Sequence, residues 1–119
     1  MMPKKILVVD DEKHIRMLYQ DELEAEGYTV ATNDGTEPIL DVVRREDPSV
    51  IVLDIKLGAN ISGLNLLQTI RSSELDRPVI LNTAYDSFQF DLKSIAATAY
   101  VVKSVDLTEL KETIARILG

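Results

Sequence analysis

The chain's first apolar run is Lys5-Ile6-Leu7-Val8-Val9, and it ends abruptly at Asp10-Asp11-Glu12. Three further runs also end at a polar residue: Val50-Ile51-Val52-Leu53 at Asp54, Pro78-Val79-Ile80-Leu81-Asn82 at Thr83, and Tyr100-Val101-Val102 at Lys103. Continuous apolar runs of this length are typical of buried parallel strands. Because ligands of open α/β sheets bind beyond the carboxyl ends of the strands, we expect these polar residues to meet in one crevice.

The composition indicates one acidic domain. The chain has 119 residues, of which 45% are hydrophobic, and we expect residues 1–119 to form a single domain with one core. A net charge of −7 argues against binding to nucleic acid or to an anionic membrane surface. The absence of cysteine excludes thiol catalysis, and His14 alone cannot build a histidine metal site. No apolar stretch approaches the ~18 residues of a membrane span, and no signal peptide is evident, so a cytoplasmic location is expected.

The segments between the apolar runs have the spacing of amphipathic helices. The first helix should end at Gly27, Thr36 is a candidate N-cap for the second, and Asp106 is a candidate N-cap for the last. Residues 28–32 read as a short strand. The apolar positions of the five predicted helices are Ile15, Leu18, Tyr19 and Leu23; Ile39, Leu40, Val42 and Val43; Leu64, Leu67 and Ile70; Leu92, Ile95 and Ala96; and Leu107, Leu110, Ile114 and Ile117.

Five strands alternating with five helices predict an α/β fold of the (βα)5 type. We expect a doubly wound, flavodoxin-like, five-stranded parallel sheet of order 2-1-3-4-5, with helices on both faces. In that order Asp10 and Asp11 face Asp54 across the switch point between the first and third strands, with Thr83 and Lys103 close by. Three carboxylates, a hydroxyl and an amine in one crevice suit a divalent cation and a phosphoryl group.

The four strand ends, taken together and in order, resemble those of the receiver domain of two-component response regulators. The resemblance covers essentially the whole chain and rests on residues 6–12, 52–54, 83–85 and 100–103. It implies that Asp54 is the phosphoryl acceptor. It also implies that Mg²⁺, or Mn²⁺ in its place, is held by Asp10, Asp11, Asp54 and the backbone carbonyl of Lys56. In the same comparison Thr83 is the switch hydroxyl, Tyr100 the switch aromatic residue, and Lys103 the site lysine.

The chemistry explains why such residues are needed. A carboxylate that attacks a phosphoryl donor is repelled by the donor's negative charge, and a bound Mg²⁺ offsets this repulsion. Lys103 supplies a second positive charge to the acceptor and then to its phosphate. Thr83 donates a hydrogen bond to a phosphoryl oxygen only after the phosphate has arrived, which converts the chemistry into a conformational signal.

Water that hydrolyses the aspartyl phosphate should pass the side chains two positions after Asp54 and Thr83, which are Lys56 and Tyr85. Neither is a carboxamide or a carboxylate that would orient this water, so we expect slow self-dephosphorylation and no other enzymatic activity. The loop from Ile55 to Gly63 lacks the family's proline and has one residue more than the family pattern. The site lysine is followed by Ser104 rather than by proline.

Two alternatives remain open at this stage. The chain could be a protein-interaction module of receiver fold that works without phosphorylation, although the complete set of site residues argues against it. It could also be a phosphatase or haloacid-dehalogenase-like hydrolase, but Lys56 is a poor general acid and no cap domain is available. If the resemblance holds, the phosphoryl donor is a sensor histidine kinase or a histidine phosphotransfer protein.

The expected downstream partner is a protein. It should bind the face formed by the helix marked by Leu92 and Ile95, the strand at 100–102 and the last helix. We expect no direct binding to nucleic acid or membrane, and no output domain within these 119 residues.

Overall fold

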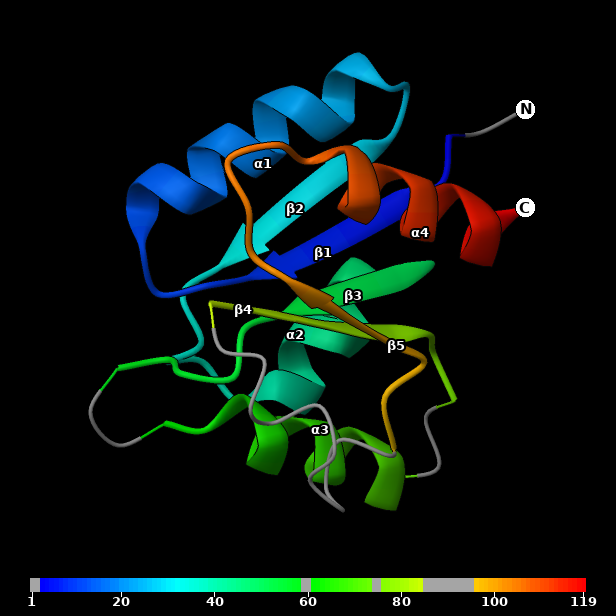
Figure 1. The fold of residues 1–119 in the computed structure, drawn as a ribbon. Helices are drawn as coiled ribbons and strands as arrows, with labels where there is room; N and C mark the ends of the chain where they lie inside the picture. The colour runs from blue at the N-terminus through cyan, green and yellow to red at the C-terminus, as the bar shows by residue number, and fades with distance from the viewer. Residues whose placement is uncertain (1–2, 59–60, 74–75, 85–95) are drawn as a thin grey trace.

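The computed structural model of the chain describes residues 3–58, 61–73, 76–84 and 96–119. Its centre is a five-stranded parallel sheet of order β2-β1-β3-β4-β5, which confirms the predicted topology (Figure 1). The strands are β1 at Lys5–Val9, β2 at Thr29–Asn33, β3 at Val50–Leu53, β4 at Val79–Thr83 and β5 at Ala99–Val102.

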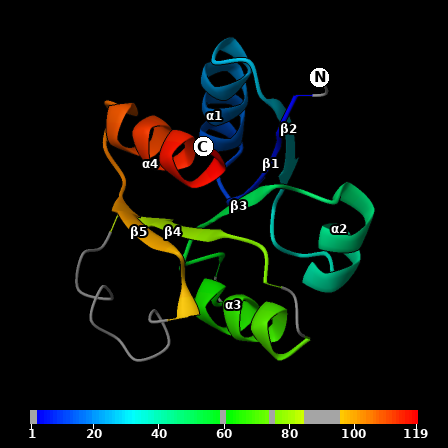
Figure 2. The same ribbon diagram turned by 90° about the vertical axis from the view of Figure 1, so that its right-hand side faces the viewer.

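Helices cover both faces of the sheet, as a doubly wound fold requires. The helices of the described residues are α1 at Lys13–Ala25, α2 at Ile39–Glu46, α3 at Gly63–Ser72 and α4 at Thr108–Leu118. Helices α1 and α4 lie on one face, and α2 and α3 lie on the other (Figure 2). None of these helices is long and apolar enough to cross a membrane. The predicted helix marked by Leu92 and Ile95 falls in residues 85–95, outside the described part of the chain.

Each face of the sheet has its own apolar core. Successive side chains of a strand point to opposite faces, so in β1 Ile6 and Val8 pack with α1 and α4, while Leu7 and Val9 pack with α2 and α3. The central strands therefore need apolar side chains on both faces. This is the physical reason for the continuous apolar runs in the sequence.

The helix ends agree with the sequence in one place and differ in two. Gly27 has a φ of +98° directly after α1, as expected of a residue that ends a helix. The prediction that Asp106 caps the last helix is wrong by one residue, because Leu107 is the N-cap of α4, although Asp106 Oδ1 accepts a hydrogen bond of 2.9 Å from the backbone N–H of Thr108. The prediction that Thr36 caps the second helix is wrong, because α2 begins at Ile39 after Pro38. The backbone N–H of Thr36 instead donates to Asp34 Oδ1, so Thr36 belongs to the preceding turn.

Candidate functional site

The register of the sheet brings the predicted site residues to one edge. Val9 lies opposite Leu53 in the β1–β3 pair, so Asp10 and Asp54 leave neighbouring strands at the same level. The backbone N–H of Asp54 donates to Val9 O at 3.0 Å, and that of Lys103 donates to the backbone oxygen of Thr83 at 2.7 Å. The polar residues after the strands are thus held by the same kind of bonds as the strands themselves.

Three buried charges form the centre of the site. Lys103 Nζ lies 2.7 Å from Asp10 Oδ2 and 3.1 Å from Asp54 Oδ2. The side chains are 15% exposed for Lys103, 3% for Asp10 and 8% for Asp54, so water screens these pairs poorly. One amine between two carboxylates leaves a net negative charge, which a further cation would balance.

The protonation states follow from this burial. Burial raises the pKa of Asp54, and the nearby Asp10 adds to the rise, while Lys103 and a backbone hydrogen bond from Lys56 oppose it. For Lys103, burial lowers the pKa, but the bonds and charges of Asp10 and Asp54 outweigh it, so its pKa is raised overall. Lys103 therefore stays protonated at neutral pH. Asp54 occupies a place where its negative charge is costly unless cations surround it.

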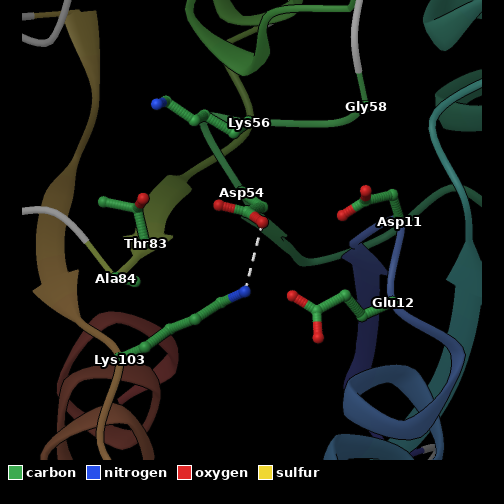
Figure 3. A pocket seen from close by; sticks show the side chains of 8 residues that line it. All are labelled: Asp11, Glu12, Asp54, Lys56, Gly58, Thr83, Ala84 and Lys103. Carbon is green, nitrogen blue, oxygen red and sulfur yellow. Dashed lines mark hydrogen bonds and ion pairs between the residues drawn. The ribbon is translucent and has the colours of Figure 1, made fainter.

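A crevice of about 280 Å³ opens above these charges (Figure 3). In this view Asp11 and Glu12 lie on the side of β1, Thr83 lies on the side of β4, and Lys103 reaches between them toward Asp54. The residues that line the crevice are Asp11, Glu12, Asp54, Lys56, Gly58, Thr83, Ala84 and Lys103. Five of the predicted site residues therefore line one space, and Asp10 is joined to them through Lys103.

The donor set of the crevice fits a hard divalent cation. Carboxylate oxygens of Asp10, Asp11 and Glu12 all lie within 4.8 Å of one another. Asp10 Oδ1 also accepts a hydrogen bond of 2.9 Å from the backbone N–H of Glu12, which fixes the orientation of its carboxylate. Together with Asp54, these groups offer only oxygen ligands, as Mg²⁺ prefers.

The loop after Asp54 is attached to the acceptor segment and to itself. Lys56 and Ser62 pair across an antiparallel bridge, and the backbone N–H of Leu57 donates to Ile61 O at 3.1 Å. A Cβ atom at Gly63 would lie only 1.8 Å from the backbone oxygen of Asp54, so only glycine fits. Gly63, at the end of this loop, therefore packs directly on the acceptor's backbone.

The two predicted switch residues lie in different surroundings. Thr83 is fully buried and lines the crevice. Tyr100 is half-buried and packs against the apolar core on the α2–α3 face, away from the crevice lining. Tyr85, the predicted second access residue, lies outside the described residues.

Sequence reasoning missed two features of this region. The strand-end pattern gives Glu12 no role, although its carboxylate lines the crevice. The helical spacing places Tyr19 in an apolar stripe, yet its hydroxyl donates a hydrogen bond of 2.6 Å to Asn82 Oδ1. The available signal was Asn82 itself, an amide that interrupts the apolar run of a buried strand.

Comparison with known proteins agrees with this geometry. The family model described as the response regulator receiver domain matches residues 6–115. The polar-differentiation response regulator DivK of Brucella anthropi is 34% identical over 99% of this chain and 98% of its own length. Sporulation initiation phosphotransferase F of Bacillus subtilis is 29% identical over 99% of this chain and 96% of its own. Several other relatives are transcriptional regulators, and the chain spans about half of their length, between 46% and 49%.

Solved structures give the same result. The response regulator TrrA of Thermotoga maritima, in complex with Mg(2+)-BeF, is 42% identical with a TM-score of 0.89, over 96% of this chain and 98% of that one. TrrA in complex with the histidine kinase ThkA is similar with a TM-score of 0.84, again at 42% identity, over 98% of this chain and 99% of that one.

Proposed function

Because this chain belongs to the response regulator receiver domain family, we propose that it is a signalling switch that accepts a phosphoryl group on Asp54. The observation that carries the proposal is the contact of Lys103 Nζ with Asp54 Oδ2, at 3.1 Å, on the floor of an acidic crevice. A buried carboxylate held by an amine and open to a pocket is placed to act as a nucleophile. We propose further that residues 1–119 act as one receiver domain, in the cytoplasm.

The proposed step is a phosphoryl transfer from a phosphohistidine. An oxygen of the Asp54 carboxylate attacks the phosphorus atom and the phosphorus–nitrogen bond breaks. The donor ring carries a proton on its other nitrogen, so it leaves with the bonding electron pair as neutral imidazole. Lys103 stays protonated and places its positive charge beside the oxygen that attacks. This charge stabilises the transferring group without any proton transfer from the lysine.

Asp10, Asp11, Asp54 and the backbone carbonyl of Lys56 would hold Mg²⁺, or Mn²⁺ in its place. The metal would supply charge neutralisation between the acceptor and the phosphoryl oxygens. The support from this chain is the oxygen-only donor set at one rim of the crevice. One structure of the similar TrrA was obtained in complex with Mg(2+)-BeF, which is consistent with such a site here.

The readout would run through Thr83 and Tyr100. The Thr83 hydroxyl lines the crevice, so a phosphoryl group on Asp54 would bind best to the conformation in which Thr83 turns toward it. Tyr100 lies in β5, which pairs with β4 up to Thr83. A shift at the end of β4 would therefore reach β5 and α4, where we propose that a downstream protein binds.

The proposed donor is a sensor histidine kinase or a histidine phosphotransfer protein. The complex of TrrA with ThkA supports a kinase as partner for a protein of this kind. A net charge of −7 disfavours direct contact with nucleic acid or an anionic membrane. Apart from slow loss of its own phosphoryl group, we propose no enzymatic activity.

The test is phosphorylation by acetyl phosphate, a small donor, followed by intact mass spectrometry with and without Mg²⁺. The wild type should gain one phosphoryl group only when Mg²⁺ is present, and Asp54→Asn should gain none while keeping its circular dichroism spectrum. Asp21→Asn, at an exposed position of α1, is the matched control and should behave as the wild type.

Two outcomes would contradict the assignment. A full phosphoryl yield in Asp54→Asn would show that the acceptor is another residue. A wild type that gains no phosphoryl group from acetyl phosphate or from a phosphorylated histidine kinase would favour the alternative, an interaction module that works without phosphorylation.

A further inference from the structure

A buried polar contact joins the first helix to the strands beneath the crevice. Tyr19, on α1, donates its hydroxyl to Asn82 Oδ1 at 2.6 Å, and the Asn82 amide donates to Val101 O at 3.0 Å. The side chains of Tyr19 and Asn82 belong to residues that are only 2% exposed. The three residues therefore form one continuous chain of hydrogen bonds from α1 through β4 to β5.

The Tyr19–Asn82 contact is polar, although its surroundings in the core are apolar. The residues around it on this face of the sheet are apolar, and they include Ile80, Val101 and Leu107. A buried hydroxyl and a buried amide lose their hydration, and the bond between them returns little net stability. Two apolar side chains of similar size would fill the same space without this cost. The pair is therefore a candidate for a role other than stability.

The position of the pair connects it to the proposed switch. Asn82 is covalently bonded to Thr83, and its partner Val101 follows Tyr100. Tyr19 also shares a mostly apolar pocket of about 290 Å³ with Lys103. The other residues that line this pocket are Ile15, Leu18, Ser104 and Val105. The pocket thus lies between α1 and the segment that joins β5 to α4, which run beside each other (Figure 1).

We infer that the Tyr19–Asn82 hydrogen bond couples the Asp54 site to α1, so that the surface of α1 at Ile15 and Leu18 reports whether the site is occupied. This inference rests on the proposed function. Tyr19 and Asn82 act as positioning residues, because neither lines the crevice that holds Asp54.

The physical argument is one of distance. At 2.6 Å the Tyr19–Asn82 bond has no room to shorten, and it weakens steeply if it is stretched or bent. A movement of Thr83 toward a phosphoryl group displaces the end of β4 and Asn82 with it. Because both residues are only 2% exposed, a broken bond would leave a buried hydroxyl and a buried amide without partners, so the lower-energy response is for Tyr19, and the turn of α1 that carries it, to follow.

A second contact holds the same turn of α1 near the site. Arg16 Nη1 donates to the backbone oxygen of Asp10 at 2.8 Å. The helix is therefore tied to the end of β1 at Arg16 and to the end of β4 at Tyr19. A relative movement of these two strand ends would rotate or tilt α1 between its two attachments, and Leu18, which is exposed between them, would move.

The test is NMR of isotope-labelled protein with Mg²⁺, before and after addition of beryllofluoride, which stands in for the phosphoryl group. In the wild type we expect signals of Thr83 and Lys103 to shift, and those of Ile15 and Leu18 to shift with them. In Tyr19→Phe and in Asn82→Leu, the Thr83 and Lys103 shifts should remain, while those at Ile15 and Leu18 fall by about half or more. Tyr28→Phe, a tyrosine of the same core at the far end of α1, is the control and should keep all shifts.

The double variant Tyr19→Phe/Asn82→Leu separates coupling from stability. Unlike Asn82→Leu alone, it leaves no buried hydroxyl without its partner, so it should be more stable than that single variant. The shifts at Ile15 and Leu18 should nevertheless stay small. If they return to wild-type size in the double variant, the pair is merely structural and the inference is overturned.

The remaining outcomes are distinguishable. Equal shifts at Ile15 and Leu18 in the wild type and Tyr19→Phe would overturn the coupling and leave the proposed function intact. A wild type in which beryllofluoride shifts neither Thr83 nor Lys103 would overturn the proposed function, and the coupling with it.

Discussion

The two ends of the sheet each hold a network of charged side chains, and the networks differ in their exposure to water. Near the start of β1, Lys5 Nζ lies 2.8 Å from Glu46 Oε1, and Arg45 pairs with both Glu46 and Glu37 at the surface. Beyond the other end of β1, Lys103 pairs with Asp10 and Asp54 in the interior. The groups are chemically alike: Arg45 lies between two carboxylates at the surface, with Lys5 as a second cation, and Lys103 lies between two carboxylates in the interior.

The difference in exposure gives the two networks different physical meanings. Solvated pairs such as Arg45 and Glu37 form at little cost and contribute little, because water and salt screen them. In the interior each charge loses its hydration, and the attraction between Lys103 and the carboxylates has to offset that loss. The inner network therefore contributes little to the stability of the fold, but it is well suited to bind a charged group.

The largest expected effect on stability and phosphorylation comes from removing Lys103, the cation that lies between the two carboxylates of the inner network. Arg45 is the corresponding cation at the surface. Lys103→Met leaves two buried carboxylates without their partner, so the free energy of unfolding should fall by about 3 kcal/mol in the absence of divalent ions. Phosphorylation by acetyl phosphate should slow by about 100-fold or more. Arg45→Met, the surface counterpart, should change neither quantity measurably. The two measurements are urea denaturation and a phosphorylation time course. Similar losses of stability and of phosphorylation rate in both variants would contradict the distinction between the two networks.

The second prediction concerns how long the phosphoryl group stays. Lys56 lines the crevice from its rim, and neither it nor Tyr85 carries a group that activates water. The variant Lys56→Asn/Tyr85→Glu introduces such groups and should speed acyl-phosphate decay by about 100-fold, within the range of general base help. Decay is followed by the loss of the phosphoryl mass after the donor is removed. A wild type that decays as fast as the double variant would contradict the prediction.

The third prediction uses Mg²⁺ to tell the networks apart. At ten times its dissociation constant, Mg²⁺ bound only to the folded chain should raise the free energy of unfolding by about 1.4 kcal/mol. Asp11→Asn, at the crevice, should lose most of this gain, whereas Glu37→Gln, in the surface network, should keep it. Urea denaturation in MgCl2 and in NaCl of equal ionic strength measures the difference. An equal gain in both variants would place the ion elsewhere.

The smallest effect concerns Tyr19, beside the inner network. Burial raises its pKa to about 12, with the carboxylates of Asp10 and Asp54 adding to the rise and Lys103 opposing it. A raised pKa in the folded chain means stability that is complete below the unfolded pKa near 10 and is lost as pH rises from there toward 12. Between about pH 9.5 and 11, the wild type should lose about 1 kcal/mol more than Tyr19→Phe. Parallel unfolding curves of the two proteins across this range would refute it.

The sequence predicts the sheet well because its signal is local and strong. Val50-Ile51-Val52-Leu53 contains four apolar residues in a row, and the structure buries all four as β3. The position of the site can be predicted from the order of the strands. Residues such as Asp54 and Lys103 come directly after parallel strands, so the strand order determines which of these residues lie close together. The grouping of carboxylates, amine and hydroxyl is thus a consequence of topology.

Other features escape this reasoning because they depend on partners far along the chain. The hydroxyl of Tyr19 meets Asn82 across 63 positions, and no periodicity reveals such a pair. The wrong cap at Thr36 has a nearer cause. Both the backbone N–H and the hydroxyl of Thr36 donate to Asp34 Oδ1, which holds Thr36 in the turn, and α2 begins only at Ile39.

The contact of Gly63 with the backbone of Asp54 has a consequence for protein engineering. Gly63 is fastened to the acceptor segment through its N–H, which donates to Ile55 O at 2.6 Å, and the loop is fastened to itself by the Leu57–Ile61 bond. Length added between Leu57 and Ile61 would therefore enter the loop beyond the bond that closes it. A reporter peptide or a fluorophore attachment site inserted there would report on the crevice from its edge without displacing the residue that carries the phosphoryl group.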